Sequence, residues 1–198
     1  MARARHGTWD ATRSRPASTA CAPAALVEWK KERHVGSLND RNDRDDLARL
    51  RVSPDLRDED AAGTLPLPRD VLAAMLAHVA AGYPDEACGI LAGAAGRVTA
   101  HFPAENASAT PRAFSEIAPE AVLAIWGELE AHGWEMLSYY HSHPDSPAYP
   151  SGHDVYWSAN WPGAYYIIFS LAERAQPIMR AFLIAGERVD EYRIIVEP

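Results

Sequence analysis

The sequence predicts an α/β fold, in which helices pack on a mixed sheet. Two stretches carry apolar residues at helical spacing, and several short apolar runs are typical of strands. After a first helix, these elements follow one another in the order β-β-α-β-α-β-β-β, which suggests such a mixed sheet with helices packed on it. A length of 198 residues, 47% of them hydrophobic, fits one such domain with some additional chain.

Helix signals are clearest in two stretches. In PRDVLAAMLAHVAAGYP (68–84), Gly82 ends the helical pattern and Pro84 follows it, and in PEAVLAIWGELEAHGW (119–134), a proline opens the helix and Gly133 closes it. A shorter helix is predicted in SGHDVYWSAN (151–160). The predicted strands are ACGILAG (87–93), VTAHFPAEN (98–106), EMLSYYHSH (135–143) and AYYIIFSL (164–171), followed by a terminal hairpin within 177–197.

The composition changes near residue 63. Residues 1–62 hold twelve of the 19 Lys and Arg residues and eleven of the 27 Asp and Glu residues, so residues 63–198 carry a net charge of −9. The first segment is too charged, and too poor in apolar periodicity, to bury the surface that would offset the entropy of ordering it. We therefore predict a disordered extension over 1–62, with room for a short helix at 47–51, and a folded domain over 63–198.

The charge and the cysteine content limit the class of protein. A net charge of −8 and a pI near 5.4 argue against a nucleic-acid partner. No apolar run approaches the roughly 18 residues of a membrane span, so no membrane association is predicted. The two cysteines, Cys21 and Cys88, cannot form a disulfide framework, which fits a reducing cytoplasm. The sequence gives no indication of the oligomeric state.

The stretch YYHSHPDSPAYPSGHDVYW (139–157) contains a candidate metal site. His141 and His143 lie two residues apart in a predicted strand, so their side chains project to the same face. Ser151 opens the next helix and Asp154 lies one turn along, where its carboxylate can approach the end of the strand. Two imidazoles, one carboxylate and an open position for water are what a hydrolytic zinc site needs. Alone, Ser-x-x-Asp is more often a helix cap and His-x-His a surface feature, but the two patterns together favour a metal site.

A hydrolase of this kind needs a general base, and Glu86 in YPDEACGILAG (83–93) is the best candidate. Partial desolvation at the start of a central strand would raise its carboxyl pKa toward the working range. Asp85 is the neighbouring competitor, and a surface acid at the end of a turn is the simpler interpretation of Glu86 taken alone. Cys88 is predicted to be a small buried hydrophobic residue rather than a nucleophile.

DEACGILAG and YHSHPDSPAYPSGHDV together resemble the JAMM (MPN-plus) metallopeptidases, whose motif is an upstream glutamate, His-x-His, seven residues and Ser-x-x-Asp. The resemblance covers about residues 66–197. It implies a cytidine-deaminase-like α/β sandwich, zinc on His141, His143 and Asp154, Glu86 as the base, and Ser151 holding the oxyanion. Within the family, PDEACG, AYPS and NASATPRAF (106–114) are most similar to short bacterial peptidases that act on ubiquitin-like sulfur-carrier proteins.

This resemblance implies zinc-dependent hydrolysis after the C-terminal Gly-Gly of such a carrier, releasing cysteine or a C-terminal extension. Lys-linked ubiquitin chains are not expected as substrates, because the 44 residues after Asp154 leave no room for a large ubiquitin-binding insertion. Two other functions stay open. His, His and Asp also form the triad of non-haem Fe(II) oxygenases, although those sites usually have His-x-Asp or His-x-Glu on an all-β scaffold. A non-catalytic MPN scaffold module would be expected to have a broken motif.

Overall fold

The computed structural model describes residues 46–198. The helices are α2 (Arg69–Gly82), α3 (Pro119–His132) and α4 (Gly152–Trp157), with 3-10 turns η1 (Asp58–Asp60) and η2 (Ser158–Asn160). The strands are β1 (Arg51–Val52), β2 (Thr64–Pro68), β3 (Cys88–Ala94), β4 (Arg97–Ala104), β5 (Glu135–His143), β6 (Tyr165–Ser170), β7 (Ile178–Ala185) and β8 (Arg188–Glu197). Over this range, every helix is too short or too polar to cross a membrane.

The strands form one mixed sheet in the order β2-β8-β7-β6-β5-β3-β4, with β1 pairing with β7. Strand β5 lies in its interior, antiparallel to β3 and parallel to β6. The predicted α/β class and the predicted order from the first helix onward are confirmed. Strand β2, which the sequence analysis did not predict, runs parallel to β8 at one edge of the sheet. Its sequence, TLPLP, contains two prolines, and proline within a sheet is largely confined to edge strands.

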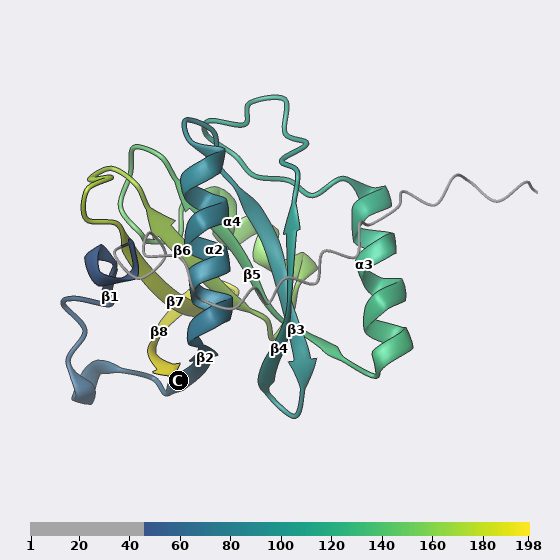
Figure 1. Cartoon of the computed structure of the whole chain (residues 1–198), viewed down its shortest axis with the longest axis horizontal. Coiled ribbons are helices and arrows are strands. Elements are labelled where there is room, and N and C mark those ends of the chain that lie inside the picture. Colours follow the sequence, from purple (N-terminus) through teal and green to yellow (C-terminus); the bar gives the residue numbers. More distant parts are fainter. Residues whose placement is uncertain (1–45) are drawn as a thin grey trace, which may run out of the picture. The chain divides into compact units, whose positions relative to one another are not determined.

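The sheet has a hydrophobic core on each face. Leu72, Met75 and Val79 of α2 pack on one face with Tyr140, Ile167 and Phe169. The other core contains Ile125 and Leu129 of α3 with Tyr139, Tyr166 and Ile168. Figure 1 shows α2 lying across the near side of the sheet and α3 to the right of the sheet. Neighbouring residues of β5 therefore belong to opposite cores, as strand alternation requires.

The predicted disordered extension is wrong for residues 46–62, whereas residues 1–45 lie outside the described part of the chain. Leu47, Leu50 and Val52 pack against the α2-side core, and residues 46–49 form a helical turn where a short helix was expected. The backbone of β1 is held by β7, with Arg51 N–H donating to Pro177 O at 2.8 Å. The composition of this segment did not reveal its packing, because its apolar residues are few and its partner strand lies more than 120 positions away in the chain.

A first prediction separates these two parts of the N-terminal segment. Deleting residues 1–45 is expected to leave kcat/KM within a few-fold, because the candidate site residues and both cores lie beyond them. Deleting residues 1–62 removes Leu47, Leu50 and Val52 as well. The apolar surface that these residues cover would then be exposed to water, and Tm should fall by at least about 5 °C. Thermal unfolding of both truncations against the full chain checks this. Equal Tm values for the two truncations would show that residues 46–62 do not stabilise the domain.

A polar cluster interrupts the α2-side core. The hydroxyl of Tyr140 lies 2.8 Å from Nδ1 of His78 and 2.7 Å from Nε2 of His101, and Tyr140 is fully buried. Burial lowers the pKa of His101 to about 4, with a smaller contribution from His78, and burial also lowers the pKa of His78. Both imidazoles are therefore neutral at pH 7 in the folded protein.

These two histidines predict a loss of stability in acid. As the pH falls below about 6.5, the unfolded chain binds a proton at His101 that the folded chain excludes down to about pH 4, so the free energy of unfolding should decrease by up to about 3 kcal/mol over that window. Denaturant unfolding at several pH values, with a chelator to remove contributions from bound metal, measures this. Glutamine does not titrate, so the free energy of unfolding of His101→Gln should decrease less in acid than that of wild type. His132→Gln, which changes an exposed histidine, should behave like wild type.

Candidate metal centre

Strand β5 delivers two histidines to one face of the sheet. His141 and His143 lie at the C-terminal end of β5, where they pair in register with Ile168 and Ser170 of β6. His141 is fully buried and His143 is 5% exposed. The Nε2 atoms of the two rings are 3.0 Å apart, as the predicted same-face arrangement requires.

Helix α4 places Asp154 against this pair. Oδ1 of Asp154 lies 3.1 Å from Nε2 of His141, and Oδ2 lies 3.6 Å from Nε2 of His143. Ligands about 2.0–2.1 Å from a tetrahedral zinc ion are roughly 3.3 Å from one another. One ligand atom from each of the three residues lies within 4.8 Å of the other two, which is close enough for them to share an ion. The donor set of two imidazole nitrogens and a carboxylate oxygen thus fits a metal ion in spacing and in chemistry.

The hydrogen bonds of His143 leave the correct nitrogen free for a ligand role. Its Nδ1 lies 2.8 Å from the carbonyl oxygen of Pro147 in the loop that follows β5. A carbonyl oxygen only accepts, so Nδ1 donates to Pro147 and Nε2 is the ring nitrogen directed toward Asp154 and His141. Ordered metal sites commonly hold their histidines through such a bond on the second ring nitrogen.

Asp154 and Ser151 form a capping box at the start of α4. The Ser151 N–H and hydroxyl each donate to Oδ2 of Asp154 at 2.7 Å, and the Asp154 N–H donates to Oγ of Ser151 at 3.1 Å. The capping interpretation of Ser-x-x-Asp is therefore correct in geometry. It is compatible with a ligand role, because Oδ1 of Asp154 remains directed at His141.

The protein keeps Asp154 ionised although the residue is only 7% exposed. Burial alone would raise the pKa of this carboxyl, but the charges and hydrogen bonds of His141, His143 and Ser151 outweigh burial and hold the pKa well below its usual range. An ionised carboxylate beside two imidazoles is the state that binds a cation.

Glu86 lies beside the same group, just before β3. It is 6% exposed, whereas Asp85, the competing candidate base, is exposed. Burial raises the pKa of Glu86, with opposing contributions from His141 and His143, so this carboxyl is more basic than an ordinary surface glutamate. Cys88 is fully buried, and burial raises the pKa of its thiol to about 12, which leaves it protonated at neutral pH.

The backbone next to Glu86 is fixed to the His-x-His strand. Ala87 N–H donates to Oγ of Ser142, and Ser142 N–H donates to Ala87 O, both at 3.0 Å. Ser142 is the residue between the two histidines, and its side chain lies on the other side of the strand. Sequence reasoning did not single out Ser142, because a serine inside a motif has no local pattern that reveals a partner 55 residues away.

A pocket of about 250 Å³ opens onto this site. Four of the five predicted residues line it, namely Glu86, His143, Ser151 and Asp154, and His141 lies beneath its surface. Its other walls come from residues 112–115 and 144–146, and from His153. Arg112 of the first wall donates to Asp145 of the second at 2.7 Å. Sequence reasoning had assigned no role to residues 112–115.

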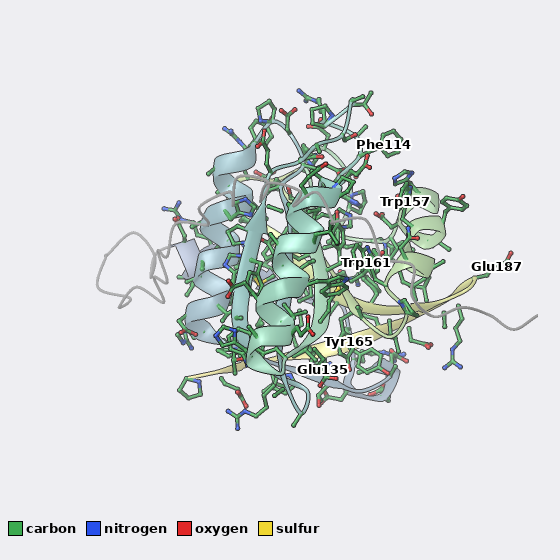
Figure 2. The ribbon with its side chains drawn as sticks, turned by 90° about the vertical axis from the view of Figure 1, so that its right-hand side faces the viewer. Phe114, Glu135, Trp157, Trp161, Tyr165 and Glu187 are labelled. Atoms are coloured by element: carbon green, nitrogen blue, oxygen red, sulfur yellow. The ribbon has the colours of Figure 1, made fainter. Side chains whose placement is uncertain are left out.

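An exposed row of aromatic rings continues from the pocket onto α4. The Phe114 ring centroid lies 4.4 Å from that of His153, which in turn lies 5.7 Å from Trp157. Figure 2 shows Phe114 and Trp157 on the same side of the molecule, with Trp161 below them. The pocket is thus bordered by apolar rings on the α4 side.

Comparisons with known proteins identify the family to which this fold belongs. A family model described as prokaryotic homologs of the JAB domain matches residues 68–184, which include Glu86 and all of 141–154. Desampylase from Haloferax volcanii is 37% identical over 139 residues, covering 67% of this chain and 96% of that protein. CysO-cysteine peptidase from Mycobacterium tuberculosis is 35% identical over 124 residues, covering 62% of this chain and 84% of that protein.

A solved structure gives the same result for the fold. The solution structure of a protein from Desulfitobacterium hafniense superposes with a TM-score of 0.60 at 34% identity, covering 67% of this chain and 92% of that one. The family model spans more than half of this chain, and the H. volcanii relative is matched over nearly its whole length. The chain therefore belongs to the prokaryotic homologs of the JAB domain and is an enzyme of the JAMM (MPN-plus) peptidase type that its motif resembles.

Proposed function

We propose that this enzyme uses zinc to hydrolyse the peptide or isopeptide bond after the C-terminal Gly-Gly of a ubiquitin-like sulfur-carrier protein, releasing cysteine or a C-terminal extension. The observation that carries the proposal is the buried His141, His143 and Asp154 group with Glu86 at the same pocket. The relatives support the substrate class, because one is named as a desampylase and another as a CysO-cysteine peptidase.

In this proposal His141, His143 and Asp154 hold the metal. Bound zinc would supply a Lewis acid that lowers the pKa of a water molecule and polarises a carbonyl oxygen. The negative charge of Asp154 and the Nε2 atom of His143 suit that role, as does the burial of both side chains. Two imidazole nitrogens and one carboxylate oxygen, with a fourth position for water, are a ligand set of catalytic zinc sites.

The protein residues then divide the proton transfers and the charge. Glu86 accepts a proton from the attacking water as a carbon–oxygen bond forms at the scissile carbonyl. Ser151 turns its hydroxyl from Asp154 toward the carbonyl oxygen and donates to it as negative charge develops. Glu86 delivers its proton to the leaving nitrogen as the carbon–nitrogen bond breaks. The raised pKa of Glu86 suits a group that first takes and then returns a proton.

The size of the pocket favours a glycine tail. About 250 Å³ is small for a ligand site, and the Arg112–Asp145 ion pair joins two of its walls at the rim. An extended Gly-Gly tail has no side chains to clash with these walls. Recognition would then depend mainly on backbone hydrogen bonds along the tail.

The direct test incubates purified protein and zinc with candidate carrier–cysteine conjugates and follows products by intact mass. We expect loss of the cysteine residue from the carrier's C-terminus. Replacing the carrier's penultimate glycine by valine should lower kcat/KM by at least about tenfold, because a misplaced scissile carbonyl is costly. Comparable rates for that carrier variant, or efficient cleavage of Lys-linked diubiquitin, would refute the carrier-peptidase assignment.

A further inference from the structure

The side chain of Asn106, which follows β4, connects distant parts of the pocket. Its Nδ2 group donates to the carbonyl oxygens of Glu86 at 2.8 Å, Phe114 at 2.9 Å and Pro111 at 3.2 Å. Its Oδ1 atom accepts from two backbone N–H groups at 3.0 and 3.1 Å, those of Ser108 and Glu116. One carboxamide thus holds five backbone groups, and one of these belongs to the candidate base.

The segment held by Asn106 forms a wall of the pocket. We call residues 107–116 the pocket loop, because 112–115 line the cavity. The loop contacts Glu86 directly, since Glu86 N–H donates to Pro111 O at 2.8 Å. Both backbone polar groups of Glu86 are therefore bonded to the loop or to the residue that organises it.

The loop also reaches the Glu86 side chain. Ser115 lines the same pocket as Glu86, and it slightly opposes the effect of burial, which raises the pKa of the Glu86 carboxyl. Ser115 is in turn fixed from the sheet, because the Tyr139 hydroxyl donates to its Oγ at 2.9 Å. The pocket loop therefore brings the side chain of Ser115 to the same pocket as the Glu86 carboxylate.

We propose that Asn106 is a positioning residue for Glu86, acting by locking the pocket loop against the backbone of the base. This inference rests on the proposed function, in which Glu86 moves the proton. Only a carboxamide supplies the donors and the acceptor that the five backbone groups need. Aspartate at this position would place a carboxylate against three carbonyl oxygens, and alanine would leave the loop without its organising bonds.

The experiment compares Asn106→Asp and Asn106→Ala with the control Ser108→Ala. Ser108 lies in the same loop, but its hydroxyl only accepts from Thr110 N–H at 3.2 Å, and it does not line the pocket. We expect both Asn106 variants to retain metal and the fold, with some loss of Tm from the missing loop bonds, and to lose kcat by about 10²-fold with a smaller change in KM, because a displacement near 1 Å can cost that much. The control should stay near wild type.

Two further readouts distinguish positioning from general damage. Trypsin should cut after Arg112 faster in the Asn106 variants than in wild type or Ser108→Ala, since the loop would open. In a Glu86→Gln background, Asn106→Ala should cause little additional loss of kcat, because it acts through the residue already changed. Additive losses would overturn the proposal, as would unchanged trypsin sensitivity or a loss of kcat that follows loss of metal.

The trypsin measurement needs no substrate. It therefore still tests the role of Asn106 in holding the loop if carrier conjugates prove not to be cleaved. In that case the proposed function would fail while the loop result stands. If the wild-type protein cleaves the conjugates and both Asn106 variants keep the same kcat, this inference alone would be refuted.

Discussion

Replacing His143 with alanine is expected to remove the bound metal and to reduce turnover to background, while the fold is retained. Nε2 of His143 is one of three donor atoms that lie within 4.8 Å of one another, and two donors would bind a metal far more weakly than three. The cores on both faces of the sheet do not include this side chain, so their packing should survive. Metal content by elemental analysis, with turnover and far-UV circular dichroism, measures the three effects.

The matched control for this variant is His132→Ala. His132 is an exposed histidine on α3 that stacks on Trp134 at 4.3 Å, and it should keep both metal and activity when replaced. About one zinc ion per chain is expected in the wild-type protein. Wild type purified without metal would contradict the zinc assignment. Wild type purified with iron and an oxygen-dependent activity would contradict it too, and would favour the oxygenase alternative.

Changing Glu86 to glutamine is expected to separate metal binding from catalysis. Glutamine has nearly the same shape and can still contact Ser115, but it cannot accept a proton from water. Because general-base catalysis typically contributes 10²–10⁴-fold, kcat should fall by about 10² or more while zinc content and KM change little. Steady-state kinetics and elemental analysis of the same preparation check both statements.

Asp85→Asn is the control for the base. Asp85 precedes Glu86 in the chain but is exposed and does not line the pocket, so its replacement should leave turnover near wild type. Near-normal turnover in Glu86→Gln, with a large loss in Asp85→Asn, would move the role of the base to Asp85. Near-normal turnover in both variants would mean that neither carboxylate is the base.

The local parts of this protein could be predicted from its sequence. Strand alternation places His141 and His143 on one face, and the Ser-x-x-Asp spacing gives the capping box that orients Asp154. Helix α3 begins at a proline and is capped at its C-terminal end by Gly133, whose φ of 63° is the left-handed conformation that glycine adopts readily. Each of these features depends on residues within about one or two turns, or on the twofold period of a strand.

Only the tertiary structure decided which distant residues surround the site. Glu86 looks like an ordinary acid at the end of a turn, and its burial follows from the antiparallel pairing of β3 with β5, in which Cys88 lies opposite His141. The hydrogen bond from Asn106 to Glu86 and the pairing of Arg51 and Val52 with β7 have the same origin. Strand register and loop contacts between residues 20 to more than 100 positions apart arise from burying two cores together, so no short stretch of sequence specifies them.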